Sequence, residues 1–299
     1  MHAQEADKPI IITGSRFVYP LIERWKEEFL KENPGVKFRL IPRGSSNVDS
    51  ANFIINAHKL KLEEIKSGSY VINISRYAIL PISNAKNPLV KEWNEKGIKT
   101  KQLKKIYFKK DEIDDEDAPL TVKRKTNEYQ PKVYTRAQKA CASITFATFY
   151  GFNQNEIIGK PIGGDDKHLI TALENDTNGI SYNNLNLIYD NVTRTSKKQL
   201  FVIPIDMNNN GRLDEAEKMY SNLDTLINRL ERKTYDNIVT EYVNVMYSTY
   251  EITTNQNLQK FLMWILENGN MYVHPLGFLQ LPAKDKQSNL ELLRASFAK

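Results

Sequence analysis

The alternation of strand and helix patterns near the amino terminus constrains the fold of this chain most strongly. Residues 10–12 form a short run of isoleucines, which is typical of a buried strand. Leu21, Trp25 and Phe29 then recur every four residues and so lie on one face of a predicted helix. Residues 36–41 predict the next strand. A strand, a helix and a strand in this order form a βαβ unit, so we expect an α/β fold.

The rest of the chain continues the same alternation and predicts two lobes. A chain of 299 residues exceeds the size at which one hydrophobic core keeps growing. We expect one lobe from residues 8–83 and 245–299, and a second lobe inserted at 84–244. Two strands would connect the lobes. By the same patterns we expect helices ending near Gly68, over 140–149, around 169–173, from 215 and from 255, and strands at 70–82, 179–182, 200–205 and 239–250.

Composition limits the class of protein. Hydrophobic residues make up 40% and charged residues 26%, which is ordinary for a folded globular chain. The formal net charge is +6, but the basic residues are scattered among 36 acidic ones, so we expect no nucleic-acid partner. No apolar run approaches the roughly 20 residues of a membrane-spanning helix. Cys141 is the single cysteine, so the chain forms no internal disulfide.

The first residues bear on the compartment. They lack the basic and apolar segments of a signal peptide, but Ala3 followed by polar residues resembles the end of a cleavage site. We therefore expect the mature form of an exported, periplasmic protein, and we expect it to be a monomer.

Two Gly-Ser turns occur where the first strands give way to the segments that follow. Gly14 and Ser15 follow the first predicted strand, with Ser15 as the expected cap of the helix after it, and Gly44, Ser45 and Ser46 follow the second strand. A turn of this kind at a helix start presents unpaired backbone N–H groups and a partial positive charge. Such turns also occur simply as caps. Both together favour a binding site for a small anion.

An ordered set of residues carries a family resemblance over nearly the whole chain. The set consists of Gly14, Ser15, Tyr19, Pro20, Leu21, Trp25, Phe29, Pro34, Gly35, Val36, Gly44, Ser45, Ser46, Leu80, Pro81, Ile82, Thr135, Arg136, Gly179, Ile180, Ser181 and Tyr182. In this order it resembles the phosphate-binding periplasmic proteins of ABC importers. The resemblance implies a two-lobed type II periplasmic-binding-protein fold that holds phosphate between its lobes and delivers it to an inner-membrane transport permease.

The resemblance also implies which residues hold the anion. They are the loop of Gly14, Ser15 and Arg16, either Ser45 or Ser46, and Arg136. The guanidinium of Arg136 would supply the planar fork that suits an oxyanion.

Two positions depart from the family's pattern. Where the family has a Ser-Asp pair, this chain has Ser75 and Arg76, and an arginine there either favours a more highly charged anion or points elsewhere. The family's Ser-Gly-Thr after the arginine is missing, and Ser143 is a candidate to replace its hydroxyls. Phosphate is the leading ligand, with a sulfate-like oxyanion as the alternative.

Residues 206–217 contain the sharpest local motif. Their spacing is that of an EF-hand calcium loop, with a glycine, Gly211, at the sixth position and a glutamate at the twelfth. The predicted ligands are Asp206, Asn208, Asn210, the backbone carbonyl of Arg212, Asp214 and Glu217. Because a strand precedes the loop and no second loop is present, we expect one structural calcium ion rather than a calcium sensor. The alternative is an Asn-rich turn with a helix cap.

The sequence carries no recognisable catalytic motif. It has no metal-binding His-Glu helix, no Walker loop, no Gly-x-Ser-x-Gly elbow and no paired-cysteine zinc signature. We therefore expect a binding protein and not an enzyme. The rival hypothesis is a non-catalytic interaction or scaffold protein of the cell envelope that keeps the fold but has lost or changed anion binding.

Overall fold

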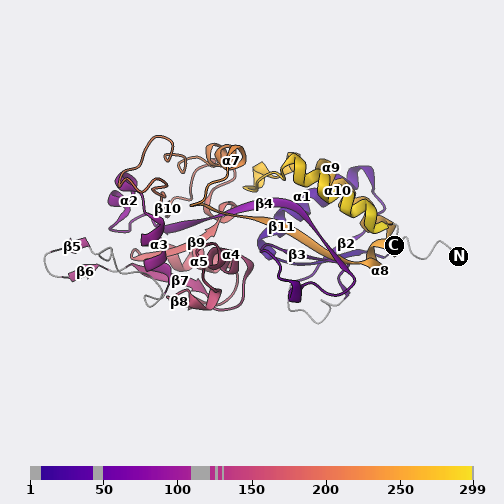
Figure 1. Ribbon diagram of the computed structural model, residues 1–299, viewed down its shortest axis with the longest axis horizontal. Coiled ribbons are helices and arrows are strands. Elements are labelled where there is room, and N and C mark those ends of the chain that lie inside the picture. Colours follow the sequence, from indigo (N-terminus) through magenta and orange to yellow (C-terminus); the bar gives the residue numbers. More distant parts are fainter. Residues whose placement is uncertain (1–7, 43–49, 109–121, 125–126, 130, 298–299) are drawn as a thin grey trace. The chain divides into compact units, whose positions relative to one another are not determined.

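The computed structural model describes residues 8–42, 50–108, 122–124, 127–129 and 131–297. The chain divides into two compact units, Met1–Tyr77 with Glu241–Lys299, and Ala78–Thr240. Strands β4 (Ser69–Asn84) and β11 (Val239–Ser248) each run from one unit into the other (Figure 1). The boundaries expected from the sequence, after residue 83 and after residue 244, fall within the same two strands.

The first unit is a sheet with helices packed against it. Its strands run in the order β2-β1-β3-β11-β4, with β1 parallel to both β2 and β3, and with β11 antiparallel to β3. The expected βαβ unit is therefore confirmed. The further elements are β1 (Ile10–Gly14), α1 (Tyr19–Glu32), β2 (Phe38–Leu40), β3 (Phe53–Asn56), α8 (Thr249–Thr254), α9 (Gln256–Asn268) and α10 (Ala283–Phe297), with 3-10 turns at Arg16–Val18, Leu62–Glu64, Gly269–Tyr272 and His274–Leu276.

Helix α1 forms because its apolar residues share one face, and that face is buried. Trp25 is fully buried, and its indole N–H donates to the carbonyl of Gly269 at 3.0 Å. One turn later, Phe29 packs edge-on against Phe261 of α9, with ring centroids 5.2 Å apart. Asn255 caps α9 by accepting a hydrogen bond from the amide of Leu258. These contacts join α1 and α9 in one core.

The second unit surrounds strands β7 and β9. Its strand order is β4-β9-β7-β8, with β10 paired to the opposite edge of β4. Strand β7 is parallel to both β8 and β9. The elements are α2 (Val90–Lys96), α3 (Thr100–Tyr107), β7 (Lys132–Arg136), α4 (Cys141–Phe149), β8 (Lys160–Ile162), α5 (Asp166–Glu174), β9 (Gly179–Asn184), α6 (Leu185–Ile188), β10 (Leu200–Val202) and α7 (Leu223–Arg232), with a 3-10 turn at Gln154–Glu156. Strands β5 (Val122–Arg124) and β6 (Asn127–Tyr129) pair as a separate hairpin.

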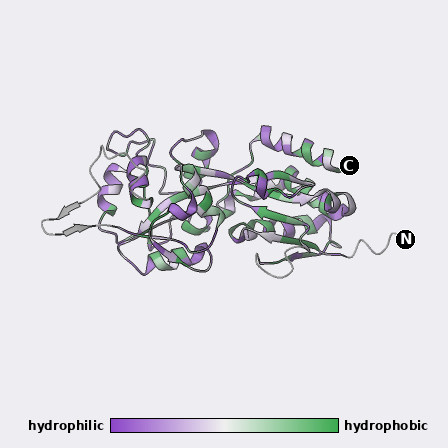
Figure 2. Ribbon diagram, turned by 60° about the horizontal axis from the view of Figure 1, so that its bottom comes forward, coloured by the Kyte–Doolittle hydropathy of each residue, from purple (hydrophilic) through white to green (hydrophobic). Residues whose placement is uncertain are grey.

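Stacked aromatic rings fill the core of the second unit. Phe146 of α4 stacks on Tyr182 of β9 with centroids 4.2 Å apart, and Tyr107 of α3 meets Phe146 edge-on at 5.0 Å. In Figure 2 the strands of each unit are coloured mainly as hydrophobic, whereas the helices alternate between the two colours. This pattern is expected for buried sheets covered by amphipathic helices.

Three expectations about local structure are wrong. No helix ends near Gly68, where the chain instead forms β3 and a 3-10 turn. The helix expected from residue 215 begins only at Leu223, with the side chain of Asn222 accepting from two amides as its cap. Ser15 stands at the start of a 3-10 turn, not of α1, and its side chain makes no capping hydrogen bond.

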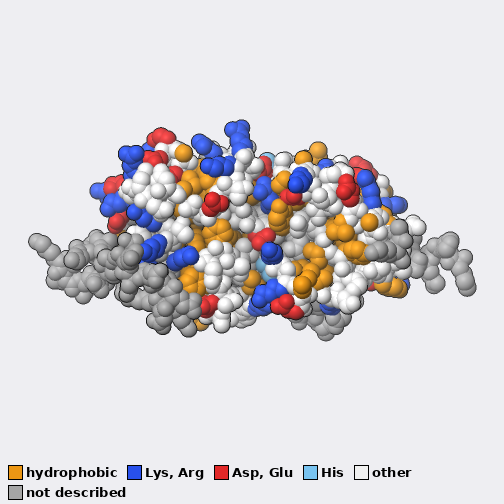
Figure 3. Space-filling model, in the orientation of Figure 1, with side chains coloured by type: hydrophobic (Ala, Val, Ile, Leu, Met, Phe, Trp, Pro, Cys, Tyr) orange, Lys and Arg blue, Asp and Glu red, His pale blue; other side chains and the backbone are white. Residues whose placement is uncertain are grey.

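Two global properties follow the composition. Within the described ranges, no helix is both long enough and apolar enough to cross a membrane. On the face shown in Figure 3, the Lys and Arg side chains are interspersed with Asp and Glu. The described residues of that face therefore form no continuous basic stripe of the kind that follows a nucleic-acid backbone.

Candidate functional site

Arg136 is the last residue of β7, at the edge of the sheet where parallel strands end. The neighbouring parallel strands, β8 and β9, end at the same edge with Ile162 and Asn184. In open α/β sheets, ligands bind at the carboxyl ends of the strands. Arg136 therefore lies where this fold places binding residues.

The guanidinium of Arg136 is buried and only partly satisfied. Its Nη1 donates to Oδ1 of Asp166 at 2.7 Å, and its Nη2 donates to the carbonyl of Gly164. Its Nε is buried and has no hydrogen-bond partner. The side chain of Arg136 is 8% exposed. A buried charged donor without a partner carries a desolvation cost that an added acceptor would remove.

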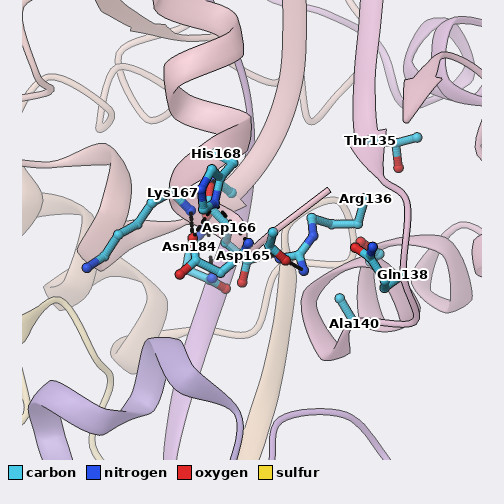
Figure 4. Close-up of polar contacts among 12 residues, drawn as sticks. Thr135, Arg136, Gln138, Ala140, Asp165, Asp166, Lys167, His168 and Asn184 are labelled. Atoms are coloured by element: carbon cyan, nitrogen blue, oxygen red, sulfur yellow. Dashed lines mark hydrogen bonds and ion pairs between the residues drawn. The ribbon is translucent and has the colours of Figure 1, made fainter. Parts of the chain in front are cut away.

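Asp166, the partner of Arg136, opens helix α5 (Figure 4). Burial raises the pKa of the Asp166 carboxyl, against the opposite effect of the Arg136 charge and hydrogen bond. The backbone carbonyl of Asp166 accepts from Nδ2 of Asn183 at 2.9 Å, which ties the start of α5 to β9. The neighbouring Asp165 caps α5 through the amide of Lys167.

Helix α4 begins close to Arg136 in the sequence and has no side-chain cap. Its N-cap residue is Ala140, which carries no polar side-chain atom. The amide of Ala140 donates to Oε1 of Gln154 at 3.0 Å, and Gln154 in turn donates to the carbonyl of Gln138 at 2.9 Å. Gln154 thus fixes the loop between β7 and α4. A helix N-terminus of this kind offers backbone N–H groups and a partial positive charge to an anion.

A chain of buried hydroxyls links β7, β9 and α4. The hydroxyl of Tyr182 donates to Oγ of Ser143 at 2.7 Å and lies 2.8 Å from Oγ1 of Thr135. All three side chains are buried. Burial raises the pKa of Tyr182 to about 12. Ser143 is therefore present in the first turn of α4, as expected, but its hydroxyl is engaged by Tyr182.

The first unit carries the other predicted anion loop at the end of β1. Gly14 has φ +133°, and a Cβ there would lie 2.6 Å from the amide nitrogen of Ile55. The amide of Ser15 donates to the carbonyl of Ile55 at 3.0 Å, and Ser15 is buried. Arg16 is exposed. Only glycine allows so close an approach, which fixes the course of this loop.

Ser75 and Arg76 are bound to the segment before α10. Oγ of Ser75 donates to the carbonyl of Leu279 at 2.9 Å, and Nε of Arg76 donates to the carbonyl of Gln280 at 3.0 Å. Because Nε is used in this way, an anion at Arg76 would have to bind the terminal nitrogens. Ser45 and Ser46 lie outside the described residues.

The structure brings together a group of residues that the sequence predicts only in part. Arg136 and Ser143 were predicted, whereas the residues that hold them, Asp166, Gln154 and Tyr182, were not. The only available signal for Asp166 was the sequence 163–166, two glycines followed by two aspartates before an apolar helix, which is typical of a turn and an N-cap. Nothing in that pattern indicates that Asp166 pairs with Arg136.

Known proteins were compared with this chain by sequence and by structure. No protein-family model and no curated protein matches the sequence. A solved structure of a phosphate ABC transporter substrate-binding protein from Clostridium perfringens, with bound phosphate, matches with a TM-score of 0.64 at 19% identity, covering 92% of this chain and 100% of that one.

Two further solved structures are similar. An ABC-type phosphate transport receptor from Vibrio cholerae has a TM-score of 0.60 at 14% identity, covering 91% of this chain and 100% of the other. A possible phosphate-binding protein from Planctomyces limnophilus has a TM-score of 0.54 at 12% identity, covering 97% and 99%. The expected type II periplasmic-binding-protein fold is therefore confirmed.

Proposed function

We propose that this chain is a periplasmic solute-binding protein that captures a small oxyanion, phosphate in the first place, for an inner-membrane ABC permease. The proposal includes no catalysis. It rests on two independent supports, the fold shared with phosphate-binding proteins and the chemistry around Arg136. Neither support depends on the other.

The observation that carries the proposal is the buried, unpartnered Nε of Arg136. Two of the guanidinium nitrogens are held by Asp166 and Gly164, which fixes the plane of the group, while Nε lacks an acceptor. Charge-assisted hydrogen bonds to an anion contribute about 1.5–3 kcal/mol each, roughly twice a neutral one. An oxyanion oxygen at Nε would thus satisfy a donor that the protein leaves unsatisfied.

A further group of donors in the same unit supports an anion. The start of α4, which has no side-chain cap, lies a few residues after Arg136. The positions where this chain departs from the phosphate-binding pattern, Ser75 and Arg76, bear on which anion is preferred. In the family that this chain resembles, the aspartate at this position accepts the proton of hydrogen phosphate. An arginine in its place would remove that acceptor, so sulfate belongs in the test.

Calorimetric titration of the purified protein with phosphate, sulfate, molybdate and tungstate tests the proposal. We expect heat with phosphate, and we expect Arg136→Gln to weaken binding by about tenfold to a hundredfold, as follows from losing a charge-assisted hydrogen bond. The matched control is Arg194→Gln, because Arg194 also pairs with a carboxylate, Asp224, at 2.6 Å in the same unit. Arg194→Gln should leave the affinity unchanged.

The rival function is a non-catalytic envelope scaffold that keeps the fold without the ligand. The changed residues at 75–76 and after Arg136 favour it. Absence of heat with every anion in the panel would overturn the binding proposal in favour of the scaffold. Heat with sulfate or molybdate but not with phosphate would retain the binding protein and change its ligand.

A further inference from the structure

Residues 206–217 fold back on their own first and last carboxylates. Oδ2 of Asp206 accepts from the amide of Gly211 at 2.8 Å, and Oδ1 of Asp206 accepts from the amide of Asn210 at 3.2 Å. Oε1 of Glu217 accepts from the amide of Met207 at 2.7 Å, and Oε2 from the amide of Asp214 at 2.9 Å. The carboxylates at positions 1 and 12 of the loop, Asp206 and Glu217, therefore both accept hydrogen bonds from the backbone of residues 207–214.

Both of these carboxylates are buried without a counter-charge. Asp206 is 0% exposed and Glu217 is 2% exposed. Among the described residues, no Lys, Arg or His side chain forms an ion pair with either of them. Burying an ionised carboxylate without a cation is costly, and buried charges in proteins are normally paired or bind metal. The missing counter-charge is an observation independent of the sequence spacing, and it favours a cation at the same position.

The side chains between the two ends supply further oxygens. Nδ2 of Asn208 and Nδ2 of Asn210 each donate to Oδ2 of Asp214 at 2.8 Å. The two side-chain amides therefore lie next to this third carboxylate. In the described part of the chain, no three His, Cys, Asp or Glu side chains are already gathered as a metal site. Because Nδ2 of Asn208 and Nδ2 of Asn210 point at Asp214, both side-chain amides must rotate to present Oδ1 to a cation. Asn208 and Asn210 would then contribute neutral oxygen ligands.

The structure and the spacing together identify the cation. We propose that residues 206–217 bind one calcium ion through Asp206, Asn208, Asn210, the carbonyl of Arg212, Asp214 and Glu217. An all-oxygen set of this size, without His or Cys, suits calcium rather than zinc. Gly211, at φ +80°, provides the sharp turn at position 6. With three carboxylates, the expected dissociation constant is on the order of 10⁻⁴ M or weaker, the range of extracellular calcium modules.

The bound ion would act as a clip within the second unit. The amide of Asp206 donates to the carbonyl of Ile98 at 3.0 Å, and the amide of Leu213 donates to the carbonyl of Glu95 at 3.1 Å. Gly97 lies so close that a Cβ there would be 2.9 Å from the nitrogen of Asp206. The loop is thus fastened to the junction between α2 and α3. Holding the loop with calcium stabilises this junction as well.

The loop also holds the segment that leads into β11. Nδ2 of Asn237, just before that strand, donates to the carbonyl of Met207 at 3.3 Å and to Oγ1 of Thr100 at 3.2 Å. The calcium site is separate in sequence from Arg136 and shares no contact with it. Calcium should therefore raise thermal stability without being a ligand of the anion site.

The test combines calorimetry and thermal melting of the full chain after removal of metal with EGTA. We expect calcium chloride to bind with one site per chain and to raise the melting temperature, with magnesium chloride giving a smaller shift. Glu217→Gln should weaken calcium binding by about tenfold or more, since it removes the bidentate ligand. The matched control is Glu215→Gln, which removes the same charge from the same loop at an exposed position.

A gain-of-affinity variant keeps the test decisive if Glu217→Gln fails to fold. Asn208→Asp adds a fourth carboxylate, so it should tighten calcium binding and lower the stability of the metal-free protein. The proposal is overturned if calcium gives neither heat nor a shift in melting temperature for the wild type. It is also overturned if Glu215→Gln and Glu217→Gln lose calcium equally, or if Asn208→Asp leaves the affinity unchanged.

Discussion

Nη1 of Arg136 lies 2.7 Å from Oδ1 of Asp166, and both side chains are largely buried, at 8% and 13% exposure. The carboxylate of Asp166 therefore already binds one nitrogen of the Arg136 guanidinium, the group that we propose holds the anion. The bound anion must share the guanidinium with Asp166 or displace it. This relationship makes Asp166 the residue that tunes the strength of anion binding.

Replacing Asp166 by asparagine leaves the buried charge of Arg136 without its counter-charge. We expect Asp166→Asn to lower the free energy of unfolding by about 2–5 kcal/mol in anion-free buffer, as for other broken buried pairs. Phosphate should restore part of this loss, because a ligand at a hundredfold its dissociation constant adds about 2.7 kcal/mol. The melting-temperature shift caused by phosphate should then be larger for the variant than for the wild type. An equal or smaller shift would show that Arg136 does not hold the anion.

The pH dependence of stability should distinguish Asp166 from its neighbour Asp165. Burial raises the pKa of Asp166 above its unfolded value of about 3.9, so the native state binds more protons and this residue's contribution to stability falls as pH rises through the raised pKa. Asp165 is the opposite case. Burial raises its pKa, but hydrogen bonds from His168 and from the Lys167 amide lower it on balance. Its contribution is present above about pH 3.9 and is lost as pH falls through the lowered pKa.

Urea unfolding between acidic and neutral pH measures both contributions. In the wild type, Asp166 contributes a decrease in the free energy of unfolding as pH rises, and Asp165 contributes an increase. Asp166→Asn should remove the decrease, and Asp165→Asn should remove the increase. The two variants change the same charge at adjacent positions, so each serves as the control for the other. Parallel profiles for the two variants would contradict the assignment.

The sequence predicts the elements that are specified by the spacing of nearby residues, but not those whose place depends on pairing with distant strands. The helix α1 and strand β1 were expected because the spacing of Leu21, Trp25 and Phe29 and the run at 10–12 specify them directly. Strand β3 was missed because it has only four residues, and its place is fixed by pairing with β1 and β11. Short buried strands and short helices cannot be separated by periodicity alone.

The same limit applied to the site. The apolar spacing after residue 215 predicted a helix there, but the carboxylate of Glu217 is bonded to amides at 207 and 214, which holds the chain in a turn until Leu223. Arg136 could be named by resemblance, whereas its partner Asp166 is 30 residues away and is selected only by the packing of α5 against β7. The sequence predicts which residues have the right chemistry for the site, but not which residues hydrogen-bond to them.

The hydroxyl chain through Tyr182 should be costly to interrupt. Tyr182→Phe leaves the buried hydroxyls of Thr135 and Ser143 without this partner, so we expect a loss of about 1–3 kcal/mol in the free energy of unfolding. The control is Tyr134→Phe in the same unit, whose hydroxyl bonds to a partly exposed carboxylate on Asp176 that water can reach. Urea titration followed by circular dichroism should show the smaller loss for Tyr134→Phe. Equal losses would mean that the buried chain adds nothing specific.

The turn at Gly14 should tolerate no side chain. In Gly14→Ala the new Cβ would meet the backbone of Ile55, 2.6 Å from its nitrogen and 2.8 Å from its carbonyl carbon, at a φ that L-residues avoid. Strand β3 cannot retreat, because it pairs with β1 on one side and β11 on the other. We expect a loss of about 2–5 kcal/mol in the free energy of unfolding.

The matched control for Gly14 is Gly35→Ala, where no atom lies within 4 Å of the added Cβ. That variant should unfold at nearly the same urea concentration as the wild type. A Gly14→Ala protein that unfolds at the same urea concentration as Gly35→Ala would contradict the close approach of Gly14 to Ile55.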